Sequence, residues 1–188
     1  MPNTTGWTEG EDVWLCTAYT NISDDRATGT DQERWHLWER IHAVYCQIAT
    51  VGATPRNAGS LQSRWSSLIR PDVSLFASLY GLVEAEGHSG WTDDDYFREA
   101  NNRFSAKREQ QNANALEGFK KNPNRTKPRP KPDVFRFKHC FDVLETAYDS
   151  CGQFRLPARG PQYLQWALLV GIFQVSCNIL FLFKRQPS

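Results

Sequence analysis

The stretch 56–69, RNAGSLQSRWSSLI, constrains the fold more than any other part of the chain. Leu61, Trp65 and Leu68 lie at positions i, i+4 and i+7, which is the spacing of one apolar stripe on a helix. The opposite side would carry small polar or basic residues, namely Arg56, Gly59, Ser63, Ser66, Ser67 and Arg70. Such a helix can enter a DNA major groove, where small residues allow close approach and arginines reach phosphates or guanine edges. An ordinary amphipathic helix with a solvated face has the same pattern.

Capping signals and apolar spacing predict further helices on both sides of this stretch. Thr8 and Glu11 have the spacing of a capping box, and Thr92 precedes three aspartates as a second N-cap. These signals predict helices over 9–21, 32–47, 71–86, 93–108 and 134–148. Pro71 is expected to interrupt or kink the path between the third and fourth helices, because proline disfavours helical geometry before it. The sequence therefore predicts an all-α chain.

The predicted core is rich in tryptophan. Trp35, Trp38, Ile41 and Tyr45 form an aromatic stripe on the second helix, and such stripes belong to cores far more often than to cofactor sites. We expect Trp14, Trp35 or Trp38, and Trp65 to share one core. His42 lies on the same face and is interpreted as a core or boundary histidine.

Charge is distributed unevenly along the chain. The formal net charge is +1, but residues 1–90 hold six basic and eleven acidic side chains, whereas residues 91–188 are net basic. Attraction to a polyanion must therefore come mainly from the second half, or from a local arginine face in the first half.

A Pro-rich basic stretch over 109–133 is expected to be a disordered linker. It can serve as a nuclear import signal or a phosphate-binding arm, or it can be a solvated spacer. Its basic residues are Lys120, Lys121, Arg125, Lys127, Arg129 and Lys131.

The tail contains an uncharged segment over 163–183, from Tyr163 to Phe183, with basic residues on both sides. Its length and flanks match a membrane-spanning helix, so a tail anchor is the alternative to a nuclear protein. Two other interpretations are a buried helix and a segment that lies outside the natural reading frame of the domain. We expect the 149–188 tail to be dispensable for the folded part.

Neither a metal centre nor an active site is expected. The five cysteines are far apart, no Cys/His spacing suits zinc, and no Gly-rich phosphate loop occurs. His139 and Cys140 are adjacent, so on a helix they should point in different directions. The sequence predicts no cofactor, no metal and no catalytic residue. It begins without a secretory signal, so reduced intracellular cysteines are expected.

Several segments, in order along the chain, resemble the Myb/SANT-like, trihelix-related proteins associated with Harbinger-type transposons. The regularly placed tryptophans resemble the core of a Myb/SANT repeat. The segments that carry the resemblance are 7–12, 15–23, 29–32, 38–42, 60–68, 72–76, 89–95 and 135–144.

The resemblance implies a Myb-like third helix that reads double-stranded DNA, in a nuclear protein acting with a partner such as a transposase. Gln62, Ser63 and Ser66 correspond to the base-facing positions of that helix. The predicted DNA-binding set is Arg56, Asn57, Gln62, Ser63, Arg64, Ser66, Ser67 and Arg70. The alternative is a SANT-type module that binds a basic protein through the acidic first half. The expected organisation is a helical domain over 7–108, the 109–133 linker, a short helix over 134–148 and the divergent tail.

Overall fold

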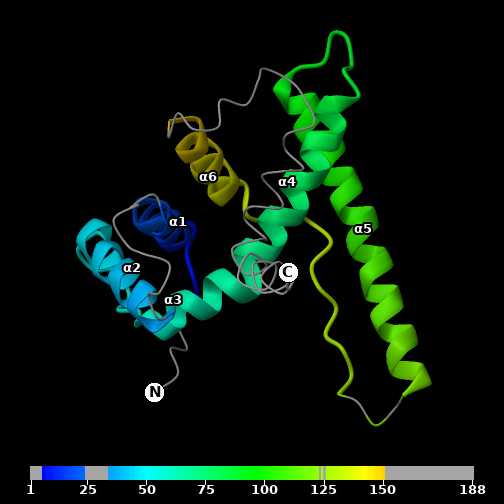
Figure 1. Ribbon diagram of the computed structural model, residues 1–188. Coiled ribbons are helices and arrows are strands. Elements are labelled where there is room, and N and C mark those ends of the chain that lie inside the picture. Colours follow the sequence, from blue (N-terminus) through cyan, green and yellow to red (C-terminus); the bar gives the residue numbers. More distant parts are fainter. Residues whose placement is uncertain (1–5, 24–33, 123, 125, 151–188) are drawn as a thin grey trace, which may run out of the picture. The chain divides into compact units, whose positions relative to one another are not determined.

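The computed structural model describes residues 6–23, 34–122, 124 and 126–150, and every regular element in these ranges is a helix (Figure 1). The predicted all-α class is therefore confirmed. The elements are α1 (Glu9–Ser23), α2 (Arg34–Ile48), α3 (Ala58–Arg64), the π-helical turn η1 (Trp65–Ile69), α4 (Arg70–Ala85), α5 (Asp93–Lys121) and α6 (Lys138–Ser150). None of these helices is long and apolar enough to cross a membrane. The 163–183 segment, for which an anchor was the alternative, lies outside the described residues.

The two capping signals fix the starts of α1 and α5. The Thr8 backbone N–H donates to the Glu11 carboxylate at 2.8 Å, and the Glu11 N–H donates to the Thr8 hydroxyl at 3.2 Å. Thr92 and Asp95 make the same reciprocal pair at the start of α5. Each box satisfies N–H groups that have no partner within the helix.

The chain divides into two compact units, and the boundary falls inside α4. The first unit contains the described residues up to Val73 together with the segment from Phe137, so it includes α1, α2, α3, η1 and α6. Within it, α1 packs against both α2 and α6, and α2 packs against α3. The short helix expected over 134–148 corresponds to α6, and its apolar face is buried in this unit against α1.

Aromatic rings link the helices of the first unit. Tyr19 of α1 stacks on Trp65 with ring centroids 4.0 Å apart and also approaches Trp38, and both tryptophans are buried. Trp14 is half-buried and meets Tyr45 edge to face at 6.2 Å. The predicted shared core is thus confirmed for Trp38 and Trp65, while the side chain of Trp35 lies outside the described part.

The turn η1 changes the register of the third helix. The Arg70 N–H bonds to the carbonyl of Trp65, five residues back, so this turn holds one residue more than an α-helical turn. The extra residue places Ile69 in the core, fully buried, and leaves Leu68 38% exposed, against the prediction that Leu68 completes the stripe. The helical path also continues through Pro71 without a break, because a wide turn relieves the clash between a proline ring and the preceding turn.

The second unit contains the described residues from Ser74 to Arg136. Phe76 of α4 lies at its centre and stacks on Phe135 at 3.9 Å, with Phe97 and Phe104 of α5 also against its ring. These ring contacts pack the middle of α4 against α5 and the segment that contains Phe135.

The predicted disordered linker is ordered over most of its length. Helix α5 continues to Lys121 because residues 109–121 contain good helix formers and the first proline comes only at position 123. Beyond it, the side-chain amide of Asn112 bonds both the N–H of Lys131, at 2.9 Å, and its carbonyl, at 2.8 Å. Ser105 holds the Asp133 carbonyl at 2.7 Å. The extended segment therefore runs back along α5 (Figure 1).

Candidate nucleic-acid interface

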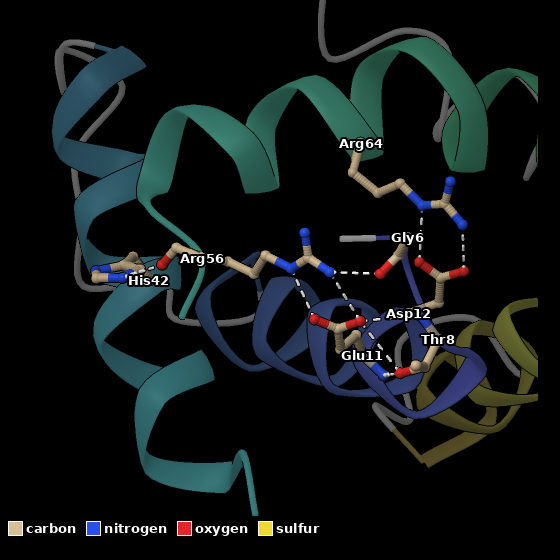
Figure 2. A network of polar contacts seen from close by, with 7 residues as sticks. All are labelled: Gly6, Thr8, Glu11, Asp12, His42, Arg56 and Arg64. Atoms are coloured by element: carbon tan, nitrogen blue, oxygen red, sulfur yellow. Dashed lines mark hydrogen bonds and ion pairs between the residues drawn. The ribbon is translucent and has the colours of Figure 1, made fainter. Parts of the chain in front are cut away.

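Arg56, predicted to face DNA, is buried, and Figure 2 shows its guanidinium directed toward Glu11 and Gly6. It is 4% exposed, and its Nε and Nη2 atoms lie 2.7 and 3.1 Å from the two carboxylate oxygens of Glu11. Nη2 also donates to the Gly6 carbonyl at 2.7 Å, and the guanidinium lies 4.3 Å from the centre of the Trp7 ring. The prediction is wrong because Arg56 precedes the Asn57 N-cap, where helical spacing does not apply.

Arg64 is on the helix but also turns inward. Its Nε and Nη2 atoms donate to the two Asp12 oxygens at 2.9 and 2.7 Å, which is a bidentate pair. The guanidinium lies 5.3 Å from the Phe137 ring, and the side chain is 16% exposed. The expected exposed arginine front is therefore wrong for Arg64 as well, because the helix pattern could not reveal an acidic partner 52 residues away.

The two acidic partners occupy the first turn of α1. Burial alone would raise the pKa of Glu11, but the hydrogen bonds and charge of Arg56, together with the Thr8 N–H, outweigh burial and lower that pKa. The carboxylate is thus held in its charged form against the guanidinium. Two ion pairs therefore join Arg56, which precedes the N-cap of α3, and Arg64, the last residue of α3, to the first turn of α1.

His42 of α2 completes this polar network (Figure 2). Its Nε2 atom lies 2.8 Å from the Arg56 carbonyl and 3.4 Å from the Cys46 thiol. The ring is half-buried, so the prediction of a boundary histidine with a satisfied nitrogen is confirmed.

What remains on the outer side of α3 and η1 is a small, uncharged face, made of Asn57, Ser63, Ser66 and Ser67, which are all exposed. Asn57 accepts a hydrogen bond from the Ser60 N–H at 2.8 Å, and the Ser66 hydroxyl donates to the Gln62 carbonyl at 2.7 Å. Gln62 and Arg70 are half-buried at its margins. We call the four exposed residues the α3–η1 face.

The basic residues of the predicted linker belong to the second unit. Lys120, Lys121, Lys127, Arg129 and Lys131 are exposed, and Arg125 lies outside the described residues. Asn112 bonds only the backbone of Lys131, and the Lys131 side chain is exposed to solvent. We call the five described residues, Lys120, Lys121, Lys127, Arg129 and Lys131, the basic strip.

Sequence reasoning missed one cluster. Asp12, His139 and Cys140 each place a potential metal-ligand atom within 4.8 Å of the others. The prediction considered His139 and Cys140 only as neighbours on one helix, whereas the packing of α6 on α1 brings Asp12 close to both of them. No local spacing could have found this set, since its members come from helices more than a hundred residues apart in sequence.

The sequence is similar to part of "Glutathione S-transferase T3" from Arabidopsis thaliana, with 30% identity over 95 residues. The matching residues make up 50% of this chain but only 16% of that protein. No protein-family model matches the chain, and no solved structure matches it.

Proposed function

We propose that this chain binds double-stranded DNA by placing the α3–η1 face in the major groove. The observation that supports this most is the character of that face, where exposed side chains are small, polar and uncharged. Small side chains let a helix backbone approach base edges, and serine hydroxyls can donate to or accept from either strand. The Myb/SANT-like resemblance assigns the same helix to DNA reading, through Gln62, Ser63 and Ser66.

The roles of the basic residues differ from those expected from the sequence. Arg56 and Arg64 hold α3 against α1, so they position the reading face rather than contact phosphates. Phosphate contacts fall to exposed residues of the basic strip, such as Lys120, Lys127 and Lys131. With few cations on the reading helix itself, binding should be modest in affinity, and a strong salt dependence should come from the phosphate contacts of the basic strip.

Selection from a pool of random duplexes at low salt tests this proposal, followed by anisotropy titrations with the selected sequence. Ser63→Glu places a negative charge on the α3–η1 face and should abolish retention of the selected duplex. Ala43→Glu puts the same side chain at an exposed position of α2 and should bind as the parent does. Equal binding by both variants, or no enrichment of any sequence, would refute the groove model.

A second candidate function is docking of a protein rather than DNA, as in SANT-type modules. One observation favours it: Leu68 is 38% exposed beside the uncharged α3–η1 face, in a half of the chain that is acidic overall. A Leu68→Ser variant distinguishes the two functions. It should leave DNA binding intact in the groove model, and it should weaken capture of a basic partner in the docking model.

The remaining functional expectations follow from the DNA-binding proposal. The protein acts in the nucleus, with import directed by the 120–131 basic residues, and works beside a partner such as a transposase. It is not an enzyme; His42, bonded to a backbone carbonyl, has a structural role. The transferase name belongs to a relative of which this chain matches only a small part.

A further inference from the structure

We propose that Asp12, Cys16, His139 and Cys140 form a binding site for a divalent metal of the zinc class, which fastens α6 to α1. Asp12 and Cys16 are four residues apart, so they lie on one face of α1. His139 and Cys140 come from the first turn of α6, the helix packed on that face. The four side chains offer one oxygen, one nitrogen and two sulfurs, which are the donor atoms that zinc takes in structural sites.

The distances fit a site that closes with small side-chain movements. His139 Nε2 lies 3.6 Å from Asp12 Oδ2, and the ligand atoms of Asp12, His139 and Cys140 all lie within 4.8 Å of one another. Ligand atoms around a tetrahedral zinc are about 3.3–3.8 Å apart, as bonds of roughly 2.0–2.3 Å require. Cys16 lies one turn after Asp12 on α1 and is fully buried, as Cys140 is, so it supplies the fourth donor.

A buried nitrogen without a partner points to a missing ligand at this place. His139 Nε2 is buried and has no hydrogen-bond partner among the described residues, while its nearest charged neighbour is a carboxylate too distant for a hydrogen bond. Buried polar atoms are nearly always paired, so an atom like this one calls for an explanation. A cation between the imidazole and the carboxylate would satisfy both.

Charge balance also supports the site. Without metal, the Arg64 cation pairs with the Asp12 carboxylate, so this ion pair carries no net charge. Binding of a divalent ion displaces the two thiol protons to solvent and leaves two thiolates, one carboxylate, the metal and Arg64. That set is again neutral, so the buried cluster keeps its net charge.

Arg64 then becomes an outer partner of the metal. Carboxylate ligands of metals are commonly hydrogen-bonded by a second group, which orients them. Arg64 already donates to both oxygens of Asp12, and a carboxylate has lone pairs enough to accept these bonds and bind a metal through Oδ2. The ion pair and the metal are therefore compatible.

The test uses the full chain in which Cys46, Cys151 and Cys177 are replaced by serine, so that only the two buried thiols remain. Under a phosphine reductant, titration with Co²⁺ should give thiolate-to-cobalt charge-transfer absorption and the intense visible bands of a tetrahedral ion, saturating at one equivalent. Zn²⁺ should displace the cobalt and raise the melting temperature. Cys140→Ser should remove most of the charge-transfer band, and His139→Asn should weaken binding at least about tenfold.

The outcomes separate the alternatives. His139→Asn keeps the test decisive if Cys140→Ser does not fold, because the histidine ring is partly exposed and contributes less to packing. Absence of a charge-transfer band in the starting chain, or a band unchanged in either variant, would overturn the proposal. So would a Cys16–Cys140 disulfide that forms on removal of the reductant in a chain that binds no cobalt.

Discussion

Arg64 and Asp12, 52 residues apart, form a bidentate ion pair in which both guanidinium–carboxylate distances are under 3 Å. With the parallel pair between Arg56 and Glu11, it joins α3 to the first turn of α1. This pairing removes two arginines from the outer surface and leaves the α3–η1 face uncharged. Some of the acidic residues in the first half of the chain therefore neutralise arginines of the same half.

The buried pair of Arg56 and Glu11 should dominate the acid stability of the first unit. Arg56→Gln leaves the Glu11 carboxylate buried without its partner, and removing one member of such a pair costs about 3–5 kcal/mol of unfolding free energy. Because the pKa of Glu11 is lowered in the folded chain, its contribution is present above its ordinary value of 4.5 and is lost as the pH falls below it. Urea unfolding between pH 7 and pH 3 measures this.

The control for that experiment is Arg98→Gln. Arg98 forms an ion pair on α5, but its side chain is 69% exposed, so its replacement should change stability by less than about 1 kcal/mol at any pH. If Arg56→Gln has the same small effect as the control, the buried pair does not hold the unit together.

The wide turn η1 predicts opposite effects for two neighbouring residues. Ile69→Ala should cost about 2–5 kcal/mol because Ile69 is fully buried, whereas Leu68→Ala should cost less than about 1 kcal/mol. A regular α-helix would make the Leu68 replacement costly as well, since Leu68 would then continue the Leu61–Trp65 stripe. Thermal unfolding of the two variants decides between the registers.

The features that the sequence predicted correctly depend on residues that are close to one another along the chain. The capping boxes at Thr8 and Thr92 set helix starts within a few residues, and apolar spacing correctly placed Trp38 and Trp65 in the core. Contacts between distant segments could not be read in this way. The partners of Arg56 and Arg64, and the meeting of Cys16 with Cys140, depend on how α1, α3 and α6 pack. The π-helical turn could not be predicted either. Its extra residue changes the helical period, and only Pro71 in the sequence hints at an irregular helix there.

Tyr45 should titrate late and tolerate loss of its hydroxyl. Burial, and then the charge of Glu11, raise the pKa of Tyr45 to about 12, and its hydroxyl has no hydrogen-bond partner in the described part of the chain. Tyrosines in the unfolded chain lose their proton near pH 10. The free energy of unfolding should therefore fall as the pH rises from about 10 to about 12, because the folded chain still holds this proton.

Tyr45→Phe checks this prediction. It removes an unpaired buried group, so the free energy of unfolding at pH 7 should stay the same or rise by up to about 1 kcal/mol. The late step in a spectrophotometric tyrosine titration should disappear. A loss of more than about 1 kcal/mol would instead reveal a hydrogen bond to the hydroxyl.

Helix α6 should be required for the fold of the first unit, although it follows the first helices by more than fifty residues. Phe137, Phe141 and Leu144 are buried in that unit, and α1 packs closely against α6. Burial of each such side chain contributes about 1.5–3 kcal/mol, so their joint loss is comparable to the whole stability of a small domain. A chain ending after Arg136 should therefore unfold at a much lower temperature than one ending after Ser150.

Thiol reactivity shows where the damage occurs in the shorter chain. It retains two cysteines, of which Cys46 is exposed and Cys16 is buried in the intact unit. In the chain ending after Ser150, only Cys46 should react quickly with a soluble disulfide reagent, because Cys16 and Cys140 are both buried. In the chain ending after Arg136, Cys16 should react about as fast as Cys46, since the face of α1 that held α6 is open. If Cys16 stays protected and the melting temperature is unchanged, α6 is peripheral and α1–α3 fold without it.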